Sequence, residues 1–409
     1  MRSSKFIAAA AFAGMMVSGL AAHGQAPNSI RIGYPISLTG PNAPGAKITT
    51  LPNYRLWVKE VNAGGGIMLA SVGKRVPIEV IEYDDLSNVD TAVAAIERLI
   101  TQDKVDFVLP PYGTGLNLAV GPVLHSAGYP DLAVTAMSDR APELAKLWPN
   151  SFWFNSTATD TAVGMVETIA KLRSEGKIGN TVAMLSAADQ LGIGLAKAAR
   201  RALKKSGFEL VYDRAYTHDG SNVDLENMRT LMTEVKQLNP DSFIAFSYPS
   251  DTVAVTDQAR ALSFNPKVFY TAIGTAFPFY KKHFGPDIEG VMGLGGWNAD
   301  SPESKAYFKR HVELMGQEPD RKAGPVIYAS LQMLQQAIER VGKIDRAAVI
   351  KELQTGTFET IIGQVKMENN FYKANWEVGQ WQNGEFHGIA PATRPGARPI
   401  MFPKPPWHN

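Results

Sequence analysis

The sequence predicts an α/β fold of two doubly wound parallel-sheet lobes. Short runs of β-branched residues, typical of buried strands, alternate along the chain with segments whose apolar residues recur at helical spacing. This alternation occurs in two successive rounds, and each round is typical of a parallel sheet with helices on both faces. A chain of 409 residues with 45% hydrophobic residues is long enough for two such lobes.

The first round of alternation ends near residue 138. Strands are expected at 29–37, 76–85, 105–111 and 131–138. A helix is expected after the second strand, because apolar residues recur there at helical spacing: Val89, Val93, Ile96 and Ile100. Apolar residues from Leu116 onward favour another helix, and Pro122 requires that helix to begin late or to bend.

The second round begins near residue 181. Strands are expected at 181–189, 208–217, 241–248 and 267–274, with helices at 191–206, 224–238 and 250–262. A long amphipathic helix follows, with one apolar stripe formed by Ile327, Leu331, Leu334, Ile338 and Val341. Two further strands are expected at 360–367 and 375–381, with a turn at Asn383-Gly384. Residues 394–409 are too rich in proline for regular structure, and we expect them along the surface.

The first 26 residues are typical of a secretory signal. Arg2 and Lys5 precede an apolar run, and the small residues Gly24 and Ala26 precede a cleavage site before Pro27. The chain contains no cysteine, which excludes disulfides, thiol catalysis and a lipid anchor on a lipobox cysteine. An exported protein without such an anchor is expected in the periplasm.

The charge of the mature chain is balanced. Removing Arg2 and Lys5 with the signal leaves 41 − 2 = 39 Lys+Arg against 39 Asp+Glu. A balanced chain favours neither nucleic acid nor anionic lipid as a partner. Later segments contain no uninterrupted apolar run of the ~18 residues that a membrane span needs, so no direct membrane insertion is expected.

Catalytic and metal-binding signatures are absent from the sequence. The patterns G-x-S-x-G, H-E-x-x-H and G-x-x-x-x-G-K-[ST] do not occur. The seven histidines are scattered, at positions 23, 125, 218, 283, 311, 387 and 408. We therefore expect no catalytic residue, no metal site and no cofactor.

The junction between the strand at 105–111 and the following helix is the strongest candidate binding loop. Gly113-Thr114-Gly115 leads into the helix, and the first N–H groups of a helix have no intrahelical partner and attract anions. Glycine lets a ligand approach the backbone closely, and the Thr114 hydroxyl adds a donor. The alternative is a helix cap that binds no ligand.

Several segments together resemble the periplasmic solute-binding proteins of the branched-chain amino acid (Leu/Ile/Val-binding) type that serve ABC importers. The similarity runs from about residue 30 to about residue 390 and rests on "IRIGYPISLTGPNAPGA", "VNAGGGI", "IEYDDLSNVDTAVAAIERLITQDKVDFVLPPYGTGLNLAVGPV", "DQLGIGLAKAARRALKKSGFELV" and "DQARALSF". This resemblance implies a type I periplasmic binding fold, in which three crossovers form a hinge and the ligand cleft lies between the lobes.

The resemblance also places the domain boundaries. Crossovers are expected near 152–157, 293–298 and 366–372. Lobe I then comprises 29–152 plus 298–372, lobe II comprises 153–297 plus 373–393, and 394–409 is a C-terminal tail.

Site residues follow from the position of each residue in the resemblance. The family loop G-P-Y-x-S-x-x-T holds a ligand carboxylate, so Gly113, Thr114 and Asn117 are expected to bind that group, with Tyr112 as a wall. Ser138 and Asp139 are expected to face the cleft from a strand-end loop, and Tyr248 is expected to close over the ligand. Phe154 and Trp297 lie near crossovers and are candidates for the cleft or for the hinge core.

Two departures from the family pattern bear on the ligand. The motif D-x-Y-G is Asp189-Gln190-Leu191-Gly192 here, and Ala272 stands where the family has an acid that accepts the ligand's ammonium. Unless Asp139 or Asp251 replaces that acid, a buried amine would lack partners. These departures favour a 2-keto, aromatic or aliphatic acid over the amino acid of the same skeleton, and an amino acid-like carboxylate is the alternative.

The expected function is that of an import receptor, a monomer that captures a small carboxylate by lobe closure and delivers it to a membrane ABC permease. A sensory module of the same fold is one alternative, and neighbouring transporter genes would distinguish the two. An α/β enzyme acting in the same cleft is another, but it needs a nucleophile–base pair or a cofactor fingerprint.

Overall fold

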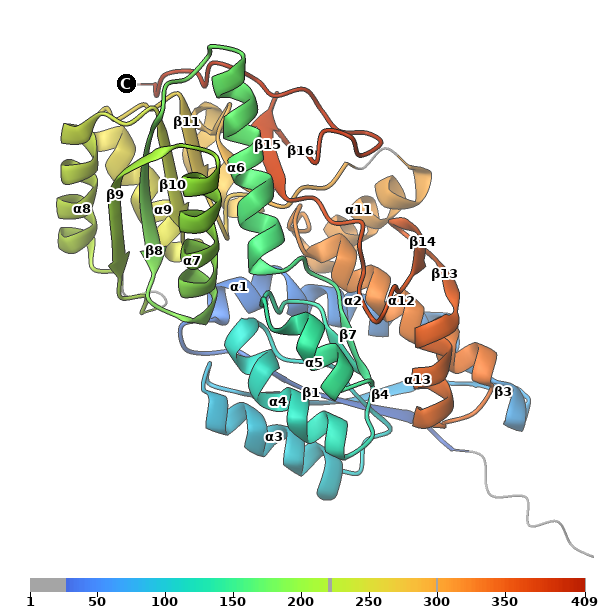
Figure 1. Ribbon diagram of the computed structural model, residues 1–409. Coiled ribbons are helices and arrows are strands. Elements are labelled where there is room, and N and C mark those ends of the chain that lie inside the picture. The colour runs from blue at the N-terminus through green and yellow to red at the C-terminus, as the bar shows by residue number, and fades with distance from the viewer. Residues whose placement is uncertain (1–26, 220–222, 299–300, 409) are drawn as a thin grey trace, which may run out of the picture.

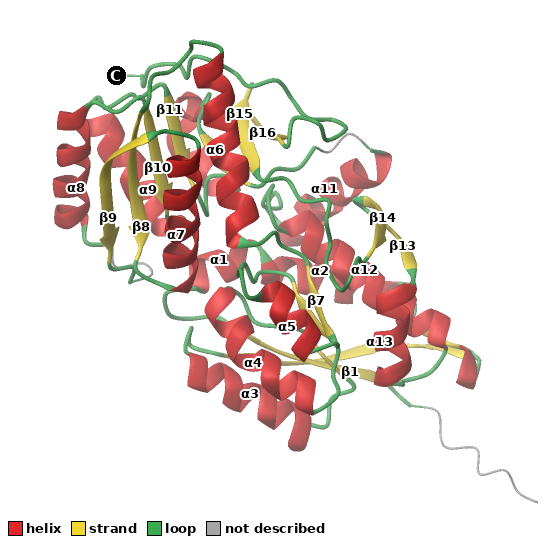
Figure 2. Cartoon of the chain, viewed as in Figure 1, coloured by secondary structure: helices red, strands yellow, loops and turns green. Residues whose placement is uncertain are grey.

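The computed structural model describes residues 27–219, 223–298 and 301–408. The expected signal, residues 1–26, lies outside the described residues. Two α/β bodies lie side by side, with the long helix α6 (Ala158–Ser174) beginning where they meet (Figure 1). Helices cover the strands in both bodies (Figure 2). We call the body that contains the first strand lobe I and the other lobe II.

Lobe I is built from elements at both ends of its sequence. Its strands are β1 (Ile30–Ile36), β2 (Ile67–Leu69), β3 (Lys74–Val76), β4 (Ile78–Asp84), β5 (Phe107–Val108), β6 (Asp131–Ala133), β7 (Ser151–Trp153), β13 (Thr357–Thr360) and β14 (Gly363–Lys366). Its helices are α1 (Ala43–Ile48), α2 (Thr50–Ala63), η1 (Ala70–Val72), α3 (Val89–Thr101), α4 (Thr114–Ser126), α5 (Ala141–Leu147), α11 (Pro302–Met315), α12 (Gly324–Val341) and α13 (Arg346–Thr355). The parallel sheet has the order β4-β1-β5, and β6 and β7 form a separate parallel pair.

Lobe II contains a seven-stranded sheet. Its strands are β8 (Thr181–Ala187), β9 (Glu209–Tyr216), β10 (Ser242–Phe246), β11 (Val268–Thr271), β12 (Met292–Leu294), β15 (Val378–Gln382) and β16 (Glu385–Ala390). Its helices are α6, α7 (Gln190–Lys205), α8 (Leu225–Leu238), α9 (Pro249–Ala261), α10 (Pro278–Phe284) and η2 (Gly285–Ile288). The order is β16-β15-β12-β11-β10-β8-β9, with only β15 and β16 antiparallel to their neighbours.

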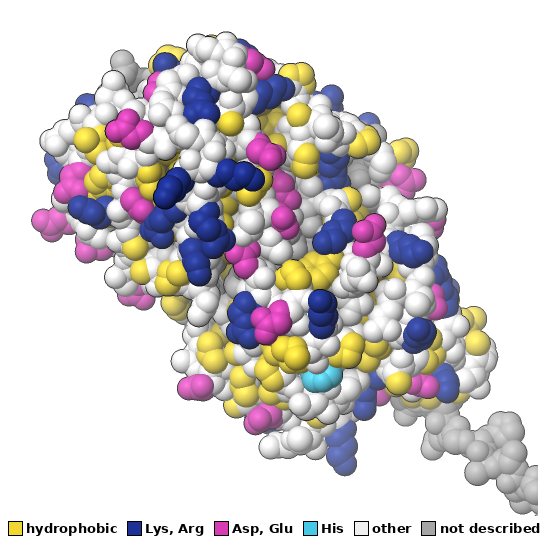
Figure 3. Space-filling model, in the orientation of Figure 1, with side chains coloured by type: hydrophobic (Ala, Val, Ile, Leu, Met, Phe, Trp, Pro, Cys, Tyr) yellow, Lys and Arg dark blue, Asp and Glu magenta, His cyan; other side chains and the backbone are white. Residues whose placement is uncertain are grey.

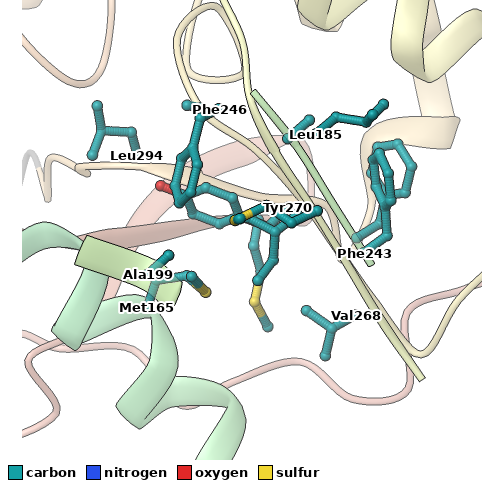
Figure 4. Close-up of a cluster of buried hydrophobic side chains, with 14 of the residues drawn as sticks. Met165, Leu185, Ala199, Phe243, Phe246, Val268, Tyr270 and Leu294 are labelled. Carbon is teal, nitrogen blue, oxygen red and sulfur yellow. The ribbon is translucent and has the colours of Figure 1, made fainter. Parts of the chain in front are cut away.

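The lobe II core lies between this sheet and its helices. Side chains from β8, β10 and β11 converge with Met165 of α6 and Ala199 of α7 (Figure 4). Phe243 packs edge-on against Phe264 and tilted against Phe269. Because the strands are buried on both faces, they read as continuous apolar runs in the sequence.

Apart from Met137, whose side chain reaches the lobe II core from a loop of lobe I, the chain changes from one hydrophobic core to the other three times. Phe154 belongs to the lobe I core and Ala158 to the lobe II core. The chain returns between Leu294 and Trp297. It passes to lobe II again after Tyr372, where Val378 begins β15.

Several predicted elements differ from the observed ones. The strand expected at 105–111 is only β5, because Pro110 and Pro111 have no N–H to donate to a neighbouring strand. The strand expected at 131–138 ends at Ala133, and the one expected at 360–367 is the β13–β14 hairpin, whose turn contains Gly363 at φ 90°. Helix α4 begins at Thr114 and continues through Pro122, so of the two alternatives, a late start or a bend, the late start does not occur.

The C-terminal tail differs in part from expectation. Residues 399–408 contain no helix or strand, as the prolines predict. The tail nevertheless packs on lobe II rather than only lying along its surface. Phe402 and Trp407 contact the lobe II core, and Lys404 is only 4% exposed.

The visible surface carries charges of both signs. Lysine and arginine side chains are interspersed with acidic ones over both lobes on the face shown in Figure 3. Within the described ranges, no helix combines the length and the apolar character needed to cross a membrane.

Candidate ligand-binding cleft

A small pocket lies between the lobes, where loops after β5 and β6 of lobe I meet loops after β8, β10 and β11 of lobe II. We call it the cleft pocket. Its volume is about 40 Å³, and its walls are Thr49, Tyr112, Gly113, Thr114, Thr135, Met137, Asn155, Leu191, Tyr248, Ile273, Phe277, Lys322 and Ala323. Ligands of open α/β sheets bind outside the carboxyl ends of the strands, which is where this pocket lies.

The predicted anion loop forms one wall of the cleft pocket. Gly113 caps α4 with φ 99° and ψ 154°, a conformation that residues with a side chain rarely adopt, and no side chain caps the helix. The first N–H groups of α4 therefore have no intrahelical partner. The N–H of Gly113 itself donates to Thr135 Oγ1 at 3.0 Å. Thr114 Oγ1 accepts the N–H of Met137 at 3.1 Å, which leaves its own O–H available to a ligand.

Asn117 lies behind the anion loop and not in the cleft pocket. Its side-chain amide donates to the carbonyl oxygens of Pro111 and Gly113, both at 2.8 Å, and the residue is 2% exposed. It does not line the cleft pocket. Asn117 thus fixes the shape of the anion loop from behind, and the carboxylate contact expected of it is not available in this arrangement.

Lys322 is the cation of the cleft pocket, and no motif around it in the sequence predicts this position. Its Nζ donates to Asn155 Oδ1 at 2.9 Å, and Asn155 is held in turn by a 2.9 Å hydrogen bond to the Val134 carbonyl. Burial lowers the pKa of the Lys322 ammonium, against the opposing effect of the nearby Asp320 and Glu377 carboxylates.

The segment that presents Lys322 is fixed by Asp320. This carboxylate accepts the N–H groups of Lys322, Ala323 and Gly324 at 2.7 to 2.8 Å and so caps the start of α12. In the sequence, Asp320 precedes the apolar stripe that begins at Ile327, and an acid shortly before a helix is a signal for a capped, ordered start.

Tyr248 lines the cleft pocket from lobe II. Its hydroxyl donates to Asp189, and its ring stacks on His218 with centroids 4.2 Å apart and planes at 13°. Its N–H donates to Asp251 at 3.3 Å. These contacts hold the ring in place, and Leu191 lies in the wall beside it.

Four other candidates lie outside the cleft pocket. Ser138 accepts the N–H of Arg140. Asp139 accepts two hydrogen bonds from Thr159 and pairs with Arg201. Phe154 is buried in the lobe I core. Trp297 lines a second cavity at the hinge.

This second cavity, which we call the hinge chamber, has a volume of about 290 Å³. Residues from all three core changes line it, including Asn155, Trp297 and Trp376. Lys322, Met137 and Asn155 line both the hinge chamber and the cleft pocket, so the two cavities share a wall.

No carboxylate lines the cleft pocket among the described residues. Asp139 is engaged elsewhere. Asp251 is 1% exposed and accepts a hydrogen bond from Tyr216 at 3.2 Å, with His218 2.8 Å away. Ala272 is buried beside the pocket-lining Ile273. The pocket therefore combines a partly buried lysine and the start of α4 with no carboxylate that could pair with an ammonium group.

Two lobes joined by three crossings, with a donor-rich pocket between them, define a two-lobed ligand-binding protein. The sequence profile of the periplasmic binding protein family matches residues 29–385, and the chain belongs to that family. It is thus a solute-binding protein and not an enzyme.

Curated relatives agree with this assignment. The chain is 24% identical to Leu/Ile/Val-binding protein homolog 7 of Brucella abortus (strain 2308) over 356 residues, which cover 82% of this chain and 84% of the relative. It is also 24% identical to the Leu/Ile/Val-binding protein of Escherichia coli (strain K12) over 336 residues, covering 82% and 85%.

Solved structures share the fold. A branched-chain amino acid transporter substrate-binding protein from Streptococcus pneumoniae, in complex with isoleucine, aligns with a TM-score of 0.73 at 21% identity and covers 88% of this chain and 97% of its own. A solute-binding protein from R. palustris, in complex with benzoate, aligns with a TM-score of 0.74 at 16% identity and covers 88% and 95%.

Proposed function

We propose that this protein is a monomeric periplasmic receptor that captures an organic carboxylate lacking an amine and delivers it to a membrane ABC permease. Family membership supports solute binding for ABC transport. The signal-like residues 1–26 support export. The relatives with known ligands include one with isoleucine and one with benzoate, so the choice between amino acid and simple acid depends on this chain's own pocket.

The observation that carries the proposal is the convergence of Lys322 and the anion loop on one pocket. A ligand carboxylate there can accept from the Thr114 hydroxyl, from the free N–H groups of α4 and from the Lys322 ammonium. Charge-assisted hydrogen bonds of this kind contribute about 1.5–3 kcal/mol each. The carboxylate also supplies a negative charge beside the partly buried Lys322, which meets no carboxylate in the lining of the cleft pocket.

The same pocket disfavours an α-amino group. No acid lines it to accept an ammonium, and the Lys322 ammonium would repel one. Burying an unpaired amine costs several kcal/mol. The apolar Leu191, Ile273 and Phe277 instead suit a hydrocarbon body.

The test is a binding panel of matched acids with two variants. We expect 4-methyl-2-oxopentanoate and phenylpyruvate to stabilise the protein in a thermal-shift assay more than leucine and phenylalanine do, because the two amino acids would bury an unpaired amine. The assay can detect binding, since a ligand at 100 times its Kd adds about 2.7 kcal/mol to the free energy of unfolding. Lys322→Met and Thr114→Ala should each lower the affinity for the better acid about 10- to 100-fold in titration calorimetry. Lys282→Met, which removes an exposed lysine on α10, should leave affinity unchanged. Stabilisation by α-amino acids alone would refute the amine-free assignment, and equal affinities of all the variants would refute this carboxylate site.

A further inference from the structure

The two cavities between the lobes differ greatly in size. The cleft pocket holds about 40 Å³ and the hinge chamber about 290 Å³. An apolar cavity of about 150 Å³ is known to accept a benzene ring. The cleft pocket therefore has room for a carboxylate group and a few atoms, whereas the hinge chamber has room for a ring with substituents.

The wall between the cavities is made of adaptable side chains. Met137, Asn155 and Lys322 line both cavities, and the hydrogen bond from Lys322 Nζ to Asn155 Oδ1 closes the wall. Methionine and lysine have several rotatable bonds and low barriers to changing rotamer. A ligand carboxylate that attracts the Lys322 ammonium toward the anion loop would compete with Asn155 and open this wall.

The walls of the hinge chamber combine aromatic and aliphatic side chains with polar ones. The polar side includes the Glu377 carboxylate, which accepts hydrogen bonds from the Ser156 and Thr161 hydroxyls. Trp297, Tyr372 and Trp376 lie in its walls. The Arg394 guanidinium lies 4.4 Å from the ring centre of Trp376 and orients that indole. Val326 and Ile362 add aliphatic surface from lobe I.

We propose that the ligand is an elongated carboxylate with an aromatic far end, which spans the shared wall. Its carboxylate lies in the cleft pocket beside Thr114 and Lys322, and its ring lies in the hinge chamber. This inference rests on the proposed function and deepens it, since it specifies the length and the far end of the acid. Because all three crossings line the chamber, a ring there also contacts the segments that must bend when the lobes move.

A chain-length series tests this placement. The probes are benzoate, phenylacetate, 3-phenylpropanoate, 4-phenylbutanoate and 5-phenylpentanoate, each titrated into the purified protein by calorimetry. A buried methylene contributes about 0.8 kcal/mol, which is about fourfold in affinity. We expect affinity to rise by about that factor for each methylene until the ring reaches the chamber, and then to level off.

Two matched variants locate the ring. Val326→Phe fills the hinge chamber and should abolish the gain with length. It should leave the affinity for acetate, whose few atoms fit the cleft pocket alone, within about twofold of wild type. Ile273→Phe fills the cleft pocket from a similarly half-buried aliphatic position and should weaken every acid in the series. If Val326→Phe does not fold, Ile362→Phe in the β13–β14 turn fills the same chamber from another element.

The outcomes separate the two proposals. Affinity that does not depend on length, or a Val326→Phe variant that weakens short and long acids equally, overturns the elongated ligand while leaving a small-carboxylate receptor intact. If the protein binds none of these acids and neither of the oxo acids named above, the proposed function itself is refuted.

Discussion

At the scale of single residues, the chain buries several ionisable groups that the cleft does not use. Asp131 begins β6 in lobe I and is only 3% exposed, and its Oδ1 has no hydrogen-bond partner among the described residues. Burial raises the pKa of this carboxyl from 3.8 to about 7. The folded protein therefore binds a proton at Asp131 much more tightly than the unfolded chain does.

Asp131→Asn should stabilise the protein in a pH-dependent way. Protonation of the Asp131 carboxyl contributes free energy of unfolding that is fully present below pH 4 and is lost as the pH rises through 7. At pH 8 the wild-type protein therefore buries a charged Asp131 carboxylate. A pKa difference of about 3 units corresponds to roughly 4 kcal/mol. We expect the variant to gain on the order of 2–4 kcal/mol in free energy of unfolding at pH 8 and little at pH 4, measured by urea denaturation. Exposed Asp219→Asn is the control, and an equal gain at both pH values would contradict this account.

The position of a site residue could be predicted only where the sequence around it defines a recognisable junction or motif. Gly113 and Thr114 lie at a strand-to-helix junction that the local pattern predicts, whereas Tyr112 and Tyr248 were assigned to the cleft from their positions in the family resemblance. Lys322 reaches the same pocket because the chain returns there some 200 residues after Thr114. In the sequence its charge is indistinguishable from that of a solvated lysine, so its role depends on tertiary structure alone.

At the scale of elements, long periodic segments were predicted well and short strands were not. The helices α7, α8 and α9 begin and end within a residue of the predicted ranges, since their apolar stripes and caps define them locally. Strand β5 has two residues because pairing stops at the prolines, and the β13–β14 hairpin reads as one strand because its turn interrupts no apolar pattern. The length of a strand depends on how far its neighbour pairs with it, and the sequence of one segment does not contain that information.

The C-terminal tail is an element without regular structure that is nonetheless held by side chains. Trp407 packs edge-on against Phe269 at 5.3 Å and donates its indole N–H to the Phe264 carbonyl at 2.7 Å. The Lys404 ammonium lies 3.3 Å from the centre of the Trp407 ring. The His408 N–H donates to Asp287 at 2.7 Å. The tail therefore covers one end of the lobe II core.

Trp407→Ala should destabilise lobe II without affecting the cleft. Because Trp407 is only half-buried, we expect a loss on the order of 2 kcal/mol, below the ~3–5 kcal/mol typical of a fully buried aromatic side chain. Chemical denaturation measures this loss, and titration with the best acid should give an unchanged Kd. Trp407→Phe keeps most of the packing and should recover more than half of the stability. An alanine variant as stable as wild type would mean that the tail is only loosely attached.

At the scale of the whole molecule, the hinge and the ligand site are physically joined. Gly295, in the second crossing, has φ 82°, and a Cβ there would collide with the side chain of Lys322. A residue that does not line the cleft pocket thus sets the position of its cation. Movement of the lobes about this crossing should therefore change the position of Lys322 relative to the bound carboxylate.

Gly295→Ala should therefore weaken ligand binding more than tenfold, because the new methyl group displaces Lys322 as well as straining the backbone. The matched control is Gly316→Ala at the end of α11, where φ is also left-handed, at 72°, but nothing lies within 4 Å of the new Cβ. Both variants should lose about 1 kcal/mol of stability from backbone strain. Calorimetry on the two proteins measures the difference, and equal affinities would show that Lys322 is positioned independently of the hinge.

The three crossings also determine the order in which the molecule can be completed during synthesis. A ribosome releases β1 to β7 early, yet lobe I lacks α12 until residue 341 and the β13–β14 hairpin until residue 366. Lobe II lacks the antiparallel edge formed by β15 and β16 until residue 390. Contacts between such distant segments require closure of long loops before they contribute stability. Nearly the entire polypeptide must therefore be available before either hydrophobic core can close.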